Sequence, residues 1–65
     1  MKLVFNGQDI DTPALTVGGL LAELGLTRER IAVEVNLGIV PKKDYDSRAL
    51  SDGDRVEVVN FVGGG

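Results

Sequence analysis

The pair Asn6-Gly7 is the feature that most constrains how this chain folds. Both residues accept a positive φ angle, and an Asn-Gly pair between two alternating segments is the strongest short-range signal for a β-hairpin. With a period of two, residues 2–6 put Leu3 and Phe5 on one face and Lys2, Val4 and Asn6 on the other, and residues 9–12 provide the second arm. The sequence therefore predicts two antiparallel strands, the second of which stops at Pro13.

Residues 16–24 have the pattern of a short amphipathic helix. Thr16 is a candidate N-cap, and Gly25 is the candidate residue that ends the helix. Gly18 and Gly19 would each cost about 1 kcal/mol relative to alanine in a helix. Either they allow close backbone packing or the first turn of the helix is loose, and we favour the packing interpretation. Four apolar side chains at helical spacing should face a sheet: Val17, Leu20, Leu21 and Leu24.

The remaining segments predict the other half of the sheet. Residues 31–36 alternate as a third strand, and a turn at residues 36–38 leads to a short apolar piece at residues 39–40. Residues 42–50 should form a loop with a helical turn, anchored by Tyr45 and Leu50. A polar turn then leads to a last strand over residues 55–61.

This order of elements predicts an α+β chain with the β-grasp (ubiquitin-like) fold. A crossover through the helix lets the last strand lie parallel to the first, which gives a mixed sheet packed on one main helix. We expect one small domain over residues 1–61 and a flexible C-terminal glycine tail over residues 62–65.

The last predicted strand has two different faces. Val56 and Val58 alternate toward the core, whereas the opposite face begins with charged residues and ends with apolar ones. A bulge that turns Phe61 into the core is an equally supported alternative at this stage. On the first interpretation, the surface for docking a partner consists of Val4, Val59, Phe61 and Val62.

Composition excludes several classes of function. The chain has no cysteine and no histidine, which removes disulfides, thiolate nucleophiles, the usual zinc ligands and the commonest general base. A net charge of −3 makes nucleic-acid binding unexpected. The aspartates between residues 44 and 54 lack EF-hand spacing, so we expect no metal site. No signal peptide or membrane-spanning run is recognisable, which predicts a cytoplasmic protein without membrane contact.

The sequence ends in three glycines. They have no side chain to bury and lose the most backbone entropy on ordering, so they contribute nothing to the stability of a domain. A glycine strand is thin, and it ends in a carboxylate that a partner could modify. We therefore predict that Gly63 and Gly64 thread into partner active sites and that the carboxylate of Gly65 is modified. A frayed terminus or an expression remnant is the alternative interpretation.

Together these segments resemble the ThiS family, the ubiquitin-like sulfur carriers of thiamine (thiazole) biosynthesis. The resemblance covers essentially the whole chain. It rests on Phe5-Asn6-Gly7, Thr16-Val17 with Leu20-Leu21, Val33-Glu34-Val35-Asn36, Ile39-Val40-Pro41, residues 52–57 and Phe61-Val62-Gly63-Gly64-Gly65.

The resemblance implies a carrier and not an enzyme. An E1-like adenylyltransferase (ThiF-like) would use ATP and magnesium to adenylate the carboxylate of Gly65, and the carrier itself would bind no cofactor. A cysteine desulfurase or other persulfide donor would convert the adenylate into a thiocarboxylate, and thiazole synthase (ThiG-like) would take the sulfur. Gly64 and Gly65 match the terminal Gly-Gly of the family, and Gly63 is a variation.

Other functions remain open at this point. The chain also resembles, in its tail and turn, the small subunit of molybdopterin synthase and the carriers of cysteine synthesis or tRNA thiolation, although molybdopterin carriers are generally longer and differ before the glycines. A β-grasp binding module without terminal chemistry is the alternative from another class.

Overall fold

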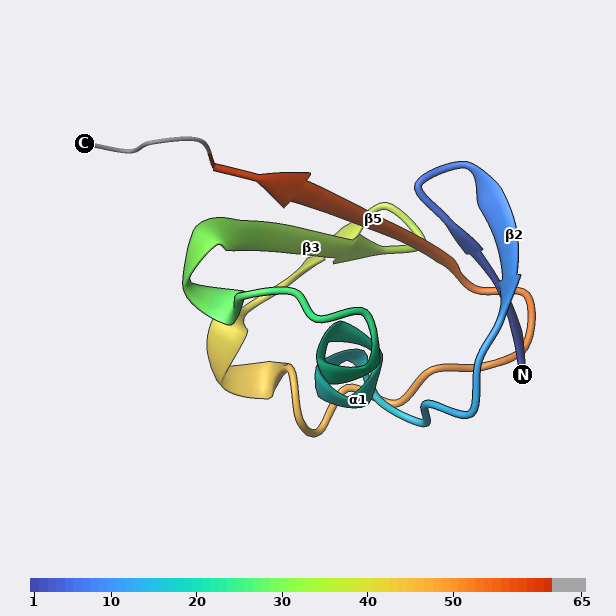
Figure 1. Ribbon diagram of the computed structural model, residues 1–65. Coiled ribbons are helices and arrows are strands. Elements are labelled where there is room, and N and C mark those ends of the chain that lie inside the picture. Colours follow the sequence, from blue (N-terminus) through green and yellow to red (C-terminus); the bar gives the residue numbers. More distant parts are fainter. Residues whose placement is uncertain (62–65) are drawn as a thin grey trace.

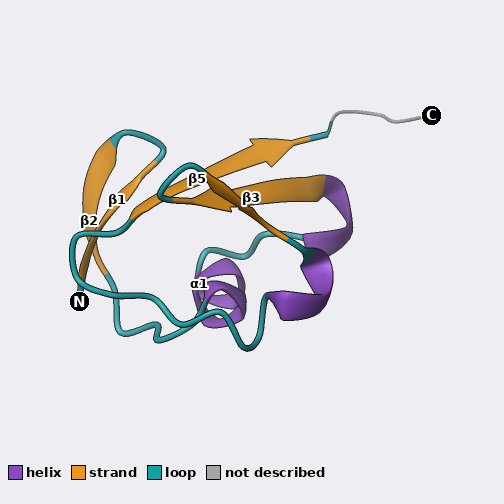
Figure 2. Ribbon diagram, turned by 180° about the vertical axis from the view of Figure 1, so that it is seen from behind, coloured by secondary structure: helices purple, strands orange, loops and turns teal. Residues whose placement is uncertain are grey.

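The computed structural model describes residues 1–61, and residues 62–65 lie outside the described part of the chain. Five strands form one sheet in the order β2-β1-β5-β3-β4, and one helix lies against a single face of that sheet (Figures 1 and 2). The elements are β1 (Lys2–Phe5), β2 (Gln8–Asp11), α1 (Val17–Glu23), η1 (Arg28–Arg30), β3 (Ile31–Val35), β4 (Gly38–Val40), η2 (Lys42–Asp44) and β5 (Arg55–Asn60).

The predicted hairpin at Asn6-Gly7 is confirmed. The two residues have φ angles of 47° and 83°, and β1 pairs antiparallel with β2 in the register Leu3 opposite Ile10. Positive φ at both central residues gives the turn a twist that matches the twist of the two strands. The Asn6 side chain also bonds to β5, where it accepts from the Val58 amide at 2.8 Å.

Helix α1 begins as the sequence predicts, because the Thr16 hydroxyl accepts a hydrogen bond from the Gly19 amide at 3.0 Å. Gly25 follows the helix with a φ angle of 71°. One member of the predicted apolar stripe differs: Leu24 is 40% exposed, because it occupies the C-cap position, past the last helical turn that faces the sheet. The other three members of the stripe are fully buried.

The loop between β4 and β5 packs on the helix through its predicted anchors, Tyr45 and Leu50, both of which are buried. The backbone carbonyl of Tyr45 accepts from the Gly18 amide at 2.7 Å. The core therefore fills the space between sheet, helix and loop. It consists of Leu3, Val17, Leu20, Leu21, Ile31, Val33, Val35, Val40, Tyr45, Leu50 and Val56.

Strand β5 lies in the middle of the sheet. It runs parallel to β1, with Val4 opposite Arg55, and antiparallel to β3, with Val33 opposite Val58. A mixed sheet with this order on one helix confirms the predicted β-grasp fold. Within residues 1–61, no helix is long and apolar enough to cross a membrane. The division into a domain (1–61) and a tail (62–65) stays a prediction.

Candidate functional site

The candidate site lies at the end of β5, which only Phe61 separates from residues 62–65 in the sequence. Ladder pairing with β3 extends to Asn60 opposite Ile31. One residue further on, the Phe61 amide still donates to the Arg30 carbonyl at 2.7 Å. Because β5 is a central strand whose inner residue Val56 is fully buried, this end of the chain starts from a fixed point on the domain.

Val59 and Phe61 share the sheet face opposite the helix. Alternation along β5 puts Val56 and Val58 on the inner face and Val59 and Phe61 on the outer one. Val59 is 60% exposed and Phe61 is 54% exposed. The alternative in which Phe61 turns into the core is therefore wrong. Ala32 of β3 lies opposite Val59 and extends this apolar surface.

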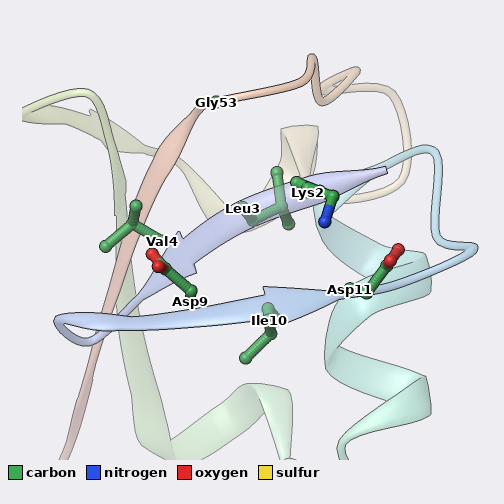
Figure 3. Close-up of a pocket in the computed structure, with 7 residues that line it drawn as sticks. All are labelled: Lys2, Leu3, Val4, Asp9, Ile10, Asp11 and Gly53. Carbon is green, nitrogen blue, oxygen red and sulfur yellow. The ribbon is translucent and has the colours of Figure 1, made fainter.

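Val4 lies on the same face but not beside Val59 and Phe61. Its cross-strand neighbours are Asp9 of β2 and Arg55 of β5. Figure 3 shows Val4 close to Asp9, in a hollow of the hairpin that also contains Lys2 and Asp11. Val59 is four positions after Arg55 along β5, which is about 13 Å at the usual rise of a strand. The structure thus brings together Val59 and Phe61 but not Val4.

Ile39 is an outer-face residue that the sequence reasoning did not assign to the docking surface. It is 77% exposed and pairs with Glu34, which in turn pairs with Glu57 of β5. The signal was available, because Val40 is an inward residue and alternation then turns Ile39 outward. Leu37, in the preceding turn, is 81% exposed and has a φ angle of 73°.

The proposed working residues of the tail, Gly63, Gly64 and Gly65, lie outside the described residues, as does Val62. Docking by Val4, Val59, Phe61 and Val62 likewise stays a prediction. Within residues 1–61, no group of three or more acidic side chains is arranged to hold a metal ion.

One ion pair joins the loop to η1 close to this end of the molecule. The Arg28 guanidinium donates two hydrogen bonds to the Asp46 carboxylate, at 2.9 and 2.5 Å, and lies 6.0 Å from the centre of the Tyr45 ring. These hydrogen bonds lower the pKa of Asp46 and raise the pKa of Arg28. The pair links η1 to the loop that follows η2, and the guanidinium of Arg28 is occupied by this contact.

We compared the sequence with those of known protein families and of individual proteins. The sequence model of the ThiS family matches residues 3–65. The chain is 40% identical to the sulfur carrier protein ThiS of Bacillus subtilis, over 97% of this chain and 98% of the relative. It is 52% identical to a thiazole synthase of Paramagnetospirillum magneticum, in an alignment that covers all of this chain.

A solved structure agrees with the fold. The crystal structure of a thiamine biosynthesis protein (ThiS) from Geobacter metallireducens has a TM-score of 0.85 and 33% identity, with complete coverage of both chains. The lengths of the sequence relatives differ widely. This chain spans only 20% of the length of the Paramagnetospirillum thiazole synthase.

Proposed function

This chain belongs to the ThiS family, and from that membership we propose that it is a sulfur carrier protein of thiamine biosynthesis. The observation that carries the proposal is the match to a sulfur carrier of almost the same length, B. subtilis ThiS, together with a family match that extends through the terminal glycines. In this function the chain is a substrate of partner enzymes and not a catalyst.

The chemistry proceeds at the carboxylate of Gly65. A carboxylate is a poor electrophile, so an E1-like (ThiF-like) partner with ATP and magnesium activates it: the carboxylate attacks the α-phosphorus of ATP and pyrophosphate leaves. The outer sulfur of a persulfide on a cysteine desulfurase or other donor then attacks the acyl adenylate and displaces AMP, which gives an acyl disulfide. A thiol of the donor reduces the S–S bond of this intermediate, so that the thiocarboxylate is released and the donor is left as a disulfide. Gly63 and Gly64 enter the partner's channel because they have no side chain.

The acceptor of the sulfur is a ThiG-like thiazole synthase in this proposal. A thiazole synthase that aligns with the whole of this chain supports that assignment over a molybdopterin acceptor. All of these reactions require the partners to be in the same compartment, which we propose is the cytoplasm.

The geometry of the described residues fits a carrier. The carrier needs to present its terminus from a rigid part of the domain. Pairing with β3 holds β5 up to Asn60, and a hydrogen bond to the Arg30 carbonyl of η1 holds Phe61. The exposed outer-face residues Val59 and Phe61 are next to the end of β5. In this proposal they make an apolar contact that docks the domain on the partner enzyme while the tail enters its channel.

The intact mass of the purified protein tests the proposal. The chain is produced alone, with an active adenylating enzyme plus a sulfur donor, and with an adenylating enzyme whose ATP site is inactivated. We expect the mass increase for one oxygen replaced by sulfur only in the second sample. Intact mass also tests whether Gly65 is the last residue.

An unchanged mass beside an adenylating enzyme that modifies B. subtilis ThiS in parallel would favour the binding module. To identify the pathway, the thiocarboxylate form is then offered to thiazole synthase and to the large subunit of molybdopterin synthase. Loss of sulfur only with the second enzyme would overturn the assignment to thiamine biosynthesis.

A further inference from the structure

The positive charges of this acidic chain gather at one end of the molecule. Seven of the ten acidic residues lie outside η1 and residues 42–48. Figures 1 and 2 show η1 and η2 at the end of the sheet where β5 finishes, with the N-terminus at the other end. The five of seven basic residues found in these two segments are Arg28, Arg30, Lys42, Lys43 and Arg48.

Arg30 is next to the point where the described chain ends. Its carbonyl accepts the hydrogen bond from the Phe61 amide at 2.7 Å, one step beyond the last ladder pair. Lys42 lies beside η1, which contains Arg30, because its ammonium group donates a hydrogen bond to the Glu29 carbonyl at 3.1 Å. Both residues are exposed. We call Arg30 and Lys42 the exit cations, because they are near the point where the chain leaves the sheet after β5.

Among residues 1–61, the exit cations and Arg48 are the basic residues at this end that no carboxylate pairs with, and of these three only the exit cations are linked by hydrogen bonds to η1 or to the end of β5. Within residues 1–61, neither has an acidic side chain within ion-pair distance. Arg28 is held in two hydrogen bonds by Asp46, and Lys43 is 3.5 Å from Asp44. A backbone carbonyl positions Lys42 without cancelling its charge.

We propose that the exit cations dock against carboxylate side chains of a partner protein, placed around the entrance of the site that receives the glycine tail. This inference rests on the proposed function. Residues 62–65 contain no charged side chain, so charged recognition near the tail has to come from the domain. A partner with an acidic entrance would repel the rest of this chain and attract only the end that carries the tail, which orients the encounter.

The exit cations fit carboxylates at the entrance of the partner's site better than they fit the phosphates of a nucleotide bound inside it. Four residues extended inside a channel span about 13 to 14 Å. The phosphates that react with the carboxylate would lie at the far end of that span, beyond the reach of side chains fixed at Arg30 and Lys42. The exit cations therefore act on association and not on the reacting atoms.

The test measures association of the full chain with the adenylating enzyme that modifies it, by stopped flow. The variants Arg30→Glu and Lys42→Glu are compared with Lys2→Glu, which makes the same change of charge at the opposite end of the molecule. Lys2 is also exposed and has no described ion pair. Thermal melting of each variant checks that it is folded, and Arg30→Gln serves as a milder second variant.

At about 20 mM salt we expect the association rate to fall about tenfold for each exit-cation variant and by less than about twofold for Lys2→Glu. The difference should nearly vanish at about 0.5 M salt, because ions screen the attraction. The turnover rate at saturating carrier should stay within about twofold of the parent.

Equal losses for all three variants would overturn the inference, because only overall charge would then matter. A loss of turnover or a raised KM for ATP would overturn it in favour of a nucleotide contact. Failure of the proposed function is a different result, in which the parent chain itself supports no pyrophosphate exchange.

Discussion

At the residue scale, Gly18 shows how a local rule is overruled by tertiary packing. A Cβ atom at Gly18 would lie 2.1 Å from the Asp46 carboxylate and 2.7 Å from the Arg28 guanidinium. The interpretation of close packing is thus confirmed at this position. Gly19 is different, since an added Cβ would meet only the Thr16 hydroxyl at 3.4 Å and Ala14 at 3.7 Å.

The two glycines therefore give a matched pair of variants. We expect Gly19→Ala to stabilise the protein by about 0.5 to 1 kcal/mol, because alanine loses less backbone entropy in a helix. Gly18→Ala should raise the free energy of unfolding by less than Gly19→Ala does, or not at all. The reason is that the new methyl group displaces the ion pair between Arg28 and Asp46. Urea unfolding of both variants measures the difference. Equal gains would show that the ion pair moves aside without loss.

The Asp46 carboxylate predicts a specific dependence of stability on pH. Its pKa is lowered from the ordinary value of 3.8 by the hydrogen bonds from Arg28. The stabilisation is therefore complete above the ordinary pKa and is lost as the pH falls through the lowered one. We expect the parent to melt at a higher temperature than Asp46→Asn near neutral pH, and this advantage to disappear in strong acid. An advantage that persists unchanged into strong acid would contradict the prediction.

At the element scale, the two faces of β5 have different roles. Its inner face belongs to the core through Val56, and its outer face ends in the exposed residues Val59 and Phe61. The strand is held on both sides, by β1 and by β3. Substitutions on the outer face should consequently affect partners more than stability.

We expect Val56→Ala to cost about 2 to 3 kcal/mol of unfolding free energy, because it removes two buried methyl groups and leaves a cavity. Phe61→Ala should cost about 1 kcal/mol, since half of the side chain is already exposed, but it should strongly weaken adenylation. Denaturant unfolding paired with a pyrophosphate-exchange assay separates the two effects. Normal adenylation of Phe61→Ala would remove Phe61 from the docking surface.

At the scale of the whole molecule, the domain sets the distance from its surface to the reacting carboxylate. Deletion of Gly65 leaves Gly63-Gly64 as the terminus and moves the carboxylate back by about 3.3 to 3.6 Å of extended chain. We expect adenylation to fall by about two orders of magnitude, because ångström-scale misplacement of a reacting group costs that much. Thermal melting should be unchanged.

Gly64→Val is the companion variant for this experiment. It keeps the length of the chain but adds a side chain that should not enter a glycine-wide channel. Pyrophosphate exchange with the purified adenylating enzyme measures both variants. If the deletion variant reacts as fast as the parent, a terminal Gly-Gly would be recognised regardless of its distance from the domain.

Much of this protein could be predicted from local sequence, because the relevant forces act between near neighbours. Asn6-Gly7 specifies a hairpin since both residues tolerate positive φ, and Thr16 caps the helix with its own hydroxyl. Alternation in residues 31–35 and 55–60 assigns the buried faces of both strands. Resemblance in residues 3–65 then supplied the family.

Only the tertiary structure decided which surface residues are neighbours, because strand register and loop position join residues far apart in the sequence. Period-two patterns place Val4, Val59 and Phe61 on one face, but the parallel register sets Val4 beside Arg55, away from the other two. The exposure of Phe61 depends on whether the ladder with β3 continues without a bulge, which the bond to Arg30 settles. That same bond brings the backbone of Arg30 in η1 to the end of β5, a proximity that depends on the pairing of β3 with β5 and that neither local sequence predicts.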